Sequence, residues 1–116
     1  MDDRSLSSVL PANKRPLTTE AVQDLAAGFK ALGDPHRLAV VDLLVRVGEP
    51  VCVVDIERHL PLAQSTVSYH LKWLVDAGVL ARERRGRWMY YWVRPERLES
   101  LREALDTFLD LSQTPG

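Results

Sequence analysis

The sequence predicts a mainly α-helical fold that contains one small two-stranded β-sheet. In four segments between residues 17 and 78, apolar side chains recur every three or four positions, which is the period of an amphipathic helix. From residue 79 to 93 the apolar residues alternate instead, and Gly86 interrupts the alternation as a tight hairpin turn requires. Helical spacing returns after Pro95. The expected order is therefore four helices, a hairpin and a closing helix.

The first two helices have clear start signals. Thr18 or Thr19 can cap the first helix, which ends at Gly33. Asp34 and Pro35 start the second helix at once, because a capping carboxylate and a proline at the first helical position both favour helix initiation. The inward-facing apolar side chains of this second helix are expected to be Leu38, Val41, Leu44 and Val45.

The third and fourth helices are expected to form a pair. The third covers about residues 54–60, and the fourth covers residues 64–77 with Val67, Leu71 and Leu74 facing inward. The opposite face of the fourth helix is small, hydroxylic and singly basic. Such a surface can enter a DNA major groove, where short polar side chains reach base edges and a lysine reaches phosphate. The expected DNA contacts are Gln64, Ser65, Thr66, Ser68, Tyr69 and Lys72.

The hairpin that follows is strongly basic. Residues 58–97 contain eight Lys or Arg and three acidic residues, a net charge of +5 against −6 for the rest of the chain. Arg84, Arg85 and Arg87 are expected to contact DNA phosphates, although charge at an exposed strand can also serve only to keep it soluble. The alternating aromatic residues of the second strand, Trp88, Tyr90 and Trp92, are expected to pack against the helices.

This layout is that of a winged helix-turn-helix domain, in which the hairpin is the wing. The first and last helices carry more apolar surface than a core of this size needs. A two-fold dimer through these two helices would bury the surplus. The expected dimer contacts are Val22, Leu25, Phe29, Leu101, Leu105 and Phe108.

Four stretches of the chain resemble the ArsR/SmtB family of bacterial winged-helix repressors. They read FKALGDPHRL (29–38), QSTVSYHLK (64–72), AGVL (77–80) and GRWMYY (86–91), in the order of the family, and the resemblance covers most of residues 20–110. It implies a homodimer formed by the first and last helices, with operator DNA read by the helix at 64–77 and flanked by the wing. It also implies that an effector, often a metal or metalloid ion, releases the repressor from DNA.

The sensing residues depart from the pattern of that family. Arsenic-sensing members carry several cysteines near the start of the third helix, whereas this chain has Cys52 alone, with Val54 and Glu57 at the other ligand positions. One thiolate cannot enclose a soft trivalent ion. Zinc-binding members use Asp and His on the last helix, which has no histidine here. His70 is expected to be a buried, hydrogen-bonded residue. Cys52 is either a small buried apolar residue or, at a helix start, a sensor thiol.

Composition and length limit the domain organisation and the location. We expect one domain over residues 17–111, a flexible tail at 1–16 and a flexible end at 112–116. No apolar run approaches the roughly 20 residues of a membrane span, and no signal-peptide pattern is present. A single cysteine suits a reducing compartment. The expected location is the cytoplasm, with no membrane partner.

The expected function is sequence-specific transcriptional repression, relieved by a metalloid ion or a thiol-reactive signal. No cofactor is expected to be required. An enzyme is a remote third possibility and is not expected, because the sequence has no nucleophile elbow, phosphate-binding glycine loop or metal-ligand pattern. The alternative is a winged-helix module that binds protein and not DNA. The basic hairpin argues against that alternative.

Overall fold

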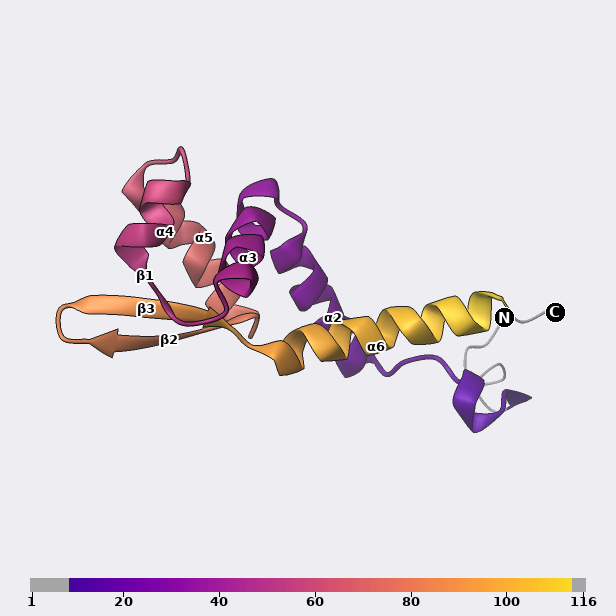
Figure 1. Ribbon diagram of the computed structural model, residues 1–116. Coiled ribbons are helices and arrows are strands. Elements are labelled where there is room, and N and C mark those ends of the chain that lie inside the picture. Colours follow the sequence, from indigo (N-terminus) through magenta and orange to yellow (C-terminus); the bar gives the residue numbers. More distant parts are fainter. Residues whose placement is uncertain (1–8, 114–116) are drawn as a thin grey trace.

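The computed structural model describes residues 9–113 and shows a winged helix-turn-helix fold (Figure 1). The ends of the two predicted tails, residues 1–8 and 114–116, lie outside the described residues. The elements are a 3₁₀ turn Ala12–Lys14, α2 Thr19–Leu32, α3 Pro35–Val47, β1 Val51–Cys52, α4 Val53–His59, α5 Gln64–Asp76, β2 Leu80–Arg85, β3 Trp88–Val93 and α6 Pro95–Ser112.

The helices begin where the local sequence signals place them. The Thr18 hydroxyl accepts a hydrogen bond from the backbone N–H of Ala21 at 3.1 Å, which confirms it as the cap of α2. The Asp34 carboxylate caps α3 by accepting from the backbone N–H groups of His36 and Arg37 at 2.9 and 3.2 Å. Each cap fixes the first turn of its helix, and Asp34 starts α3 two residues after α2 ends.

The sheet has three antiparallel strands in the order β1-β3-β2, one strand more than predicted. The additional strand, β1, pairs Val51 with Tyr91 and Cys52 with Tyr90. Two residues are too few to show an alternating pattern, so this strand depends on its tertiary neighbour β3 and leaves no periodic signal in the sequence. The predicted hairpin itself is confirmed, with Gly86 in its turn at φ 65°.

The sheet packs on the helices through the face opposite to the one predicted. Tyr91 is only 7% exposed, and Met89 and Val93 pack against the core with it, whereas Trp88 is 46% exposed. The expectation that Trp88, Tyr90 and Trp92 form the core face is therefore wrong. Alternation separates the two faces of a strand, but the residues of both faces here are apolar or aromatic, so the pattern does not say which face meets the helices.

Two of the four predicted inward positions of α3 are also wrong. Leu38 and Val45 are 54% and 47% exposed, whereas Val40, for which no inward role was predicted, is fully buried. The buried stripe of α3 has the helical spacing i, i+3, i+4, i+7 but is rotated from the predicted one. Its members are Arg37, Val40, Val41 and Leu44.

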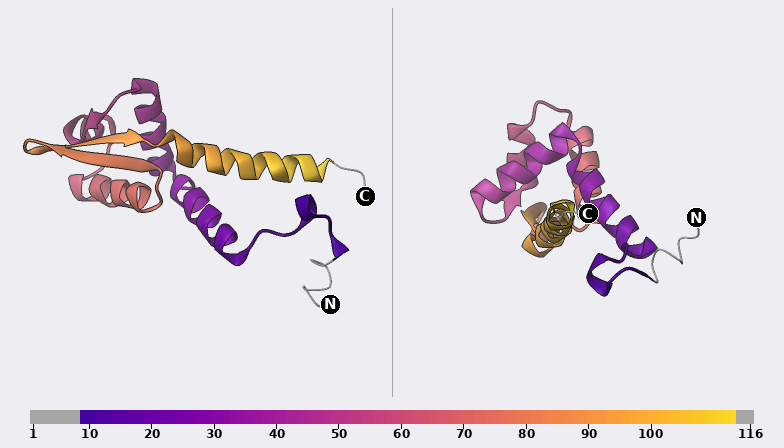
Figure 2. Two further views of the ribbon diagram at one scale, coloured as in Figure 1. Left: turned by 90° about the horizontal axis from the view of Figure 1, so that it is seen from below. Right: turned by 90° about the vertical axis from the view of Figure 1, so that its right-hand side faces the viewer.

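Helices α2 and α6 cross in contact with each other and then diverge. The last turns of α6 extend away from the other helices and the sheet (Figure 2). Gly28 of α2 allows the close approach, because a Cβ at this position would lie 2.8 Å from Cδ2 of Leu101. Leu101 is 3% exposed. The crossing thus uses Leu101 within the chain and leaves the outer surface of both helices open.

Candidate nucleic-acid interface

Helix α5 has one buried and one exposed face, as its sequence predicts. Val67, Leu71 and Leu74 are buried in the core. Thr66 lies at the margin, half-buried, and the other predicted DNA contacts, Gln64, Ser65, Ser68, Tyr69 and Lys72, are exposed. The packing of the first face therefore presents the polar face to solvent.

Lys72 already has a partner on its own helix. Its Nζ lies 2.8 Å from Oδ2 of Asp76, and both side chains are exposed. An exposed i,i+4 ion pair contributes only about 0.3–0.5 kcal/mol. The lysine can therefore exchange this carboxylate for a DNA phosphate at little cost.

A buried arginine that the sequence analysis did not single out ties α5 to α2 and α3. Arg37 donates from Nε to the carbonyl of Ala31 at 2.7 Å, from Nη2 to the carbonyl of Lys30 at 3.2 Å, and from Nη1 to Nδ1 of His70 at 3.3 Å. The two carbonyls belong to the last turn of α2, where i+4 backbone donors run out, although the carbonyl of Lys30 also accepts from the backbone N–H of Gly33 at 3.2 Å. One side chain thus completes the end of α2 and positions α5. The signal available in the sequence was its place within the stretch 29–38.

His70 is buried and hydrogen-bonded, as predicted. Burial lowers the pKa of its imidazole, although the Asp34 carboxylate 4.0 Å away opposes this effect. A guanidinium only donates hydrogen bonds, so Nδ1 of His70 must accept from Arg37. The imidazole is therefore the neutral tautomer that carries its proton on Nε2. The backbone N–H of Arg37 holds the pKa of Asp34 below its ordinary value.

The wing carries its arginines on both faces. Arg84 is opposite Met89 and Arg85 is opposite Trp88, so these two neighbours point to opposite sides of the sheet. Arg85 is held in place by Glu83, with Nη2 and Oε2 3.4 Å apart, and its guanidinium carbon lies 4.9 Å from the centre of the Tyr90 ring. Arg84 and Arg87 are exposed.

The predicted dimer contacts divide into available and unavailable residues. Val22, Leu105 and Phe108 are exposed, and Leu25 and Phe29 are half-buried. Leu101, in contrast, is buried inside the chain against α2, so its assignment to the dimer interface is not supported. Three further apolar residues are exposed and extend the available surface: Leu17, two residues before α2, and Leu109 and Leu111 of α6.

Cys52 is half-buried between β1 and α4, at the position that caps α4. A cavity of about 250 Å³ beside it is also lined by Asp55 and His59, and Nδ1 of His59 already bonds the backbone carbonyl of Asp55 at 2.8 Å. Among residues 9–113, no three His, Cys, Asp or Glu side chains come together as metal ligands. One sulfur donor does not fit a soft trivalent ion.

Comparison with known proteins identifies the family. A sequence profile of the bacterial regulatory proteins of the arsR family matches residues 34–82. The arsenical resistance operon repressor of Bacillus subtilis is 36% identical over 83 residues, which are 72% of this chain and 78% of the relative. The chain belongs to the ArsR family. Another relative of this ArsR chain, an HTH-type transcriptional regulator of Methanocaldococcus jannaschii, is 34% identical over 75% of this chain and 97% of the relative.

A solved ArsR family transcriptional regulator superposes on this ArsR chain with a TM-score of 0.75 over 82% of this chain and 96% of that structure, at 24% identity. This likeness confirms the fold. As a member of the ArsR family, the chain is a DNA-binding transcriptional repressor and not an enzyme. Within the described part of the chain, no helix of the ArsR protein is long and apolar enough to cross a membrane.

Proposed function

We propose that this chain represses transcription as a homodimer that binds operator DNA with α5 and the wing and leaves the DNA when an effector acts on it. The observation that carries the proposal is the exposed polar face of α5 beside a basic hairpin, with β2 packed against α5. A helix in the major groove and an adjacent hairpin along the backbone need this arrangement.

The first residues of α5 are suited to read base edges. Gln64 opens the helix, and its amide can pair bidentately with adenine, while the Ser65 and Ser68 hydroxyls can bond any base edge within reach. Thr66 and Tyr69 flank this row. Lys72 lies about two turns after Gln64 and is proposed to bind a DNA phosphate. Its exposed ion pair with Asp76 is weak, so a phosphate can replace the carboxylate.

The wing supplies contacts that do not depend on sequence. Arg84 and Arg87 are exposed and form no ion pair with another side chain among residues 9–113, so they are the stronger phosphate ligands. Arg85 shares its guanidinium with Glu83 and Tyr90 and contributes less. The basic charge is concentrated in residues 58–97, so a protein with a net charge of −1 can still present a basic surface to DNA.

The dimer is proposed from the apolar residues that α2 and α6 expose. Val22, Leu105 and Phe108 would be buried against the same residues of a second copy, as a two-fold axis requires. Such a dimer presents its two copies of α5 to successive major grooves about 34 Å apart on an imperfect palindrome.

The effector is proposed to act without a metalloid-binding site made of several cysteine thiolates. The Bacillus subtilis relative is named as an arsenical resistance repressor, but the donor set here offers only the Cys52 thiol. Reaction of Cys52 with a thiol-reactive signal would add bulk where β1 ends and α4 begins. Helix α4 directly precedes α5 in the chain, so this change would lie next to the helix-turn-helix. Operator DNA as the partner and a free thiol are both consistent with a location in the cytoplasm, which we include in the proposal.

Selection of duplexes from a random pool, followed by binding at about 50 and 200 mM salt, tests the proposal. We expect an enriched palindrome and a steep loss of affinity with salt. The double variant Gln64→Ala, Ser68→Ala should lose the preference for that palindrome while keeping the salt dependence. A protein that binds no duplex at either salt concentration would instead be a winged-helix module for protein partners.

A further inference from the structure

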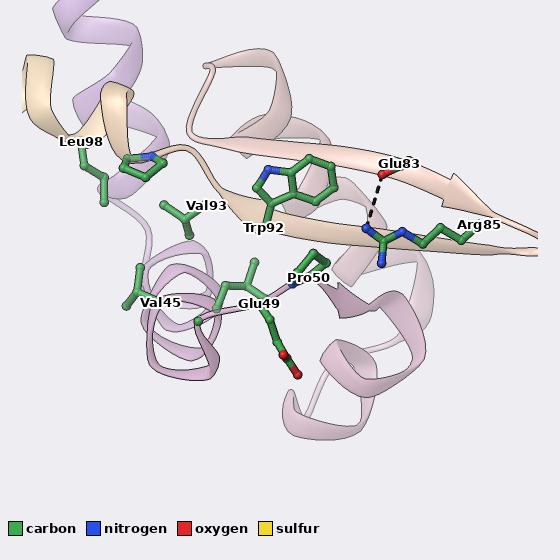
Figure 3. A pocket seen from close by; sticks show the side chains of 11 residues that line it. Val45, Glu49, Pro50, Glu83, Arg85, Trp92, Val93 and Leu98 are labelled. Carbon is green, nitrogen blue, oxygen red and sulfur yellow. Dashed lines mark hydrogen bonds and ion pairs between the residues drawn. The ribbon is translucent and has the colours of Figure 1, made fainter.

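A cavity of about 410 Å³ lies on the face of the sheet that turns away from the core (Figure 3). Its walls come from the end of α3, the segment before β1, the sheet and the first turn of α6. This volume is within the range of roughly 300–1,000 Å³ that small-molecule sites occupy. It adjoins the smaller cavity beside Cys52, with Glu49 and Pro50 forming part of the wall of both.

The walls of this cavity are mainly apolar. Val45 of α3 is 47% exposed because it faces the open space, and Leu98 of α6 approaches from the other side. The half-buried indole of Trp92 covers the sheet side, with Pro50 facing it. An indole face and aliphatic walls favour a flat, aromatic occupant, because ring stacking adds to the burial of apolar surface.

The charged groups at one end of the cavity cancel each other. Glu83 and Arg85 form an ion pair with Nη2 and Oε2 3.4 Å apart, while the carboxylate of Glu49 points away from the cavity. Both side chains of this pair are exposed, so the pair itself is weak. Because the two charges cancel, a charged ligand would lose hydration against the apolar walls without a net electrostatic attraction in return. A neutral hydroxyl or carbonyl can bond the pair without disrupting it.

We infer that this cavity binds a small, uncharged aromatic molecule that carries one hydroxyl or carbonyl group, and that the bound molecule changes the affinity for DNA. The second part rests on the proposed function. The cavity joins the wing, through Trp92 and Arg85, to the first turn of α6, so an occupant contacts both the proposed DNA-binding and dimer-forming elements. Binding coupled in this way must be reciprocal between ligand and DNA.

Three naphthalene probes of matched size test the chemical class: 2-naphthol, 2-naphthoate and 2-naphthylmethylammonium. Each is titrated into the full chain while the indole N–H signal of Trp92 is followed by NMR. We expect 2-naphthol to bind at least about tenfold more tightly than either charged probe, because the charges beside the cavity cancel and do not repay the hydration that a charged probe loses. The signal of Trp88, on the same strand face but outside the cavity, should not move.

A matched pair of variants tests the location. Val45→Phe fills the cavity and should abolish binding of 2-naphthol. Val47→Phe makes the same change at an equally exposed position of α3, 46% against 47%, that does not line the cavity, and should leave binding intact. Equal binding of the three probes, no saturable shift at Trp92, or unchanged binding by a folded Val45→Phe variant would overturn the assignment.

The effect on DNA is measured with a duplex selected from a random pool. We expect 2-naphthol to change duplex affinity about fivefold or more in the unaltered chain and not in Val45→Phe. An unchanged affinity despite a saturated Trp92 signal would overturn the regulatory part of the inference. If the protein binds no duplex at all, the proposed function fails, and the Trp92 titration still decides whether the cavity is a ligand site.

Discussion

The guanidinium of Arg37 on α3 lies over the indole of Trp73 on α5, with 4.5 Å between its carbon and the ring centre. The same guanidinium holds His70 one turn earlier on α5 and two carbonyls at the end of α2. Arg37 therefore sets the position of α5 relative to both preceding helices. Helix α5 is thus held by a polar clamp as well as by its apolar face.

Replacement of Arg37 by alanine should lower the free energy of unfolding by about 2–4 kcal/mol, because the buried carbonyl of Ala31 and the imidazole of His70 lose the donor that Arg37 provides. Urea unfolding measures this loss. Arg46→Ala is the matched control on the same helix, since Arg46 makes one exposed ion pair with Asp42 and should change stability by less than about 0.5 kcal/mol. Equal effects of the two variants would contradict the clamp.

The neutral state of His70 predicts a loss of stability in mild acid. Burial lowers its pKa in the folded chain below the ordinary 6.5, so the unfolded chain takes up the proton first as the pH falls. The free energy of unfolding should therefore decrease from about pH 7 downward, until the folded form also protonates. Denaturation series between pH 8 and 5 follow this change.

His70→Gln keeps an acceptor for Arg37 but does not titrate, so the decrease in stability below neutral pH should flatten. His59→Gln, at an exposed histidine, is the control and should retain the slope. A slope that persists in His70→Gln would assign the pH dependence to other groups.

The dimer depends on exposed apolar residues of α6. Leu105→Glu should shift the protein from dimer to monomer at tens of micromolar, because the two-fold contact would bury two unpaired carboxylates. Leu38→Glu is matched in exposure, 54% against 53%, but lies on α3 and should leave the dimer intact. Sedimentation equilibrium distinguishes the two variants, and an unaltered protein that is monomeric under these conditions would refute the interface.

The wing arginines should contribute through salt-dependent contacts. Arg84→Ala and Arg87→Ala should weaken binding to all duplexes alike and reduce the slope of log affinity against log salt by about 0.9 per lost contact in each protomer. Arg85→Ala should have a smaller effect, since Glu83 already shares its charge. Arg102→Ala on α6 makes the same change in net charge far from the wing, and an equal loss of slope there would exclude specific wing contacts.

Sensing through Cys52 can be tested with two reagents in parallel. Arsenite should release little DNA, because one thiol per protomer cannot provide the two or three sulfur ligands that this ion needs. An alkylating agent should release DNA from the unaltered protein and not from Cys52→Ser. Stoichiometric release by arsenite would reveal ligands from the partner protomer, whereas no Cys52-dependent release by either reagent would make this thiol a packing residue.

The local sequence determined where the helices begin and which face of α5 is exposed. The caps at Thr18 and Asp34 are formed within three residues of chain, so no distant contact is needed to produce them. The separation of Val67 from Ser68 follows from helical geometry alone. Chain order and these faces were sufficient to predict the helix-turn-helix, its hairpin and the residues of α5 that meet solvent.

Only the tertiary structure decided which surfaces of the other elements are buried. The face carrying Tyr91, and not the one carrying Trp88, meets the helices, because the position of the sheet is set by contacts with α3 and α5. Arg37 is buried because its partners belong to α2 and α5, and Leu101 is buried because Gly28 admits it. Burial of these residues depends on chain segments far away in sequence, and no local period records such contacts.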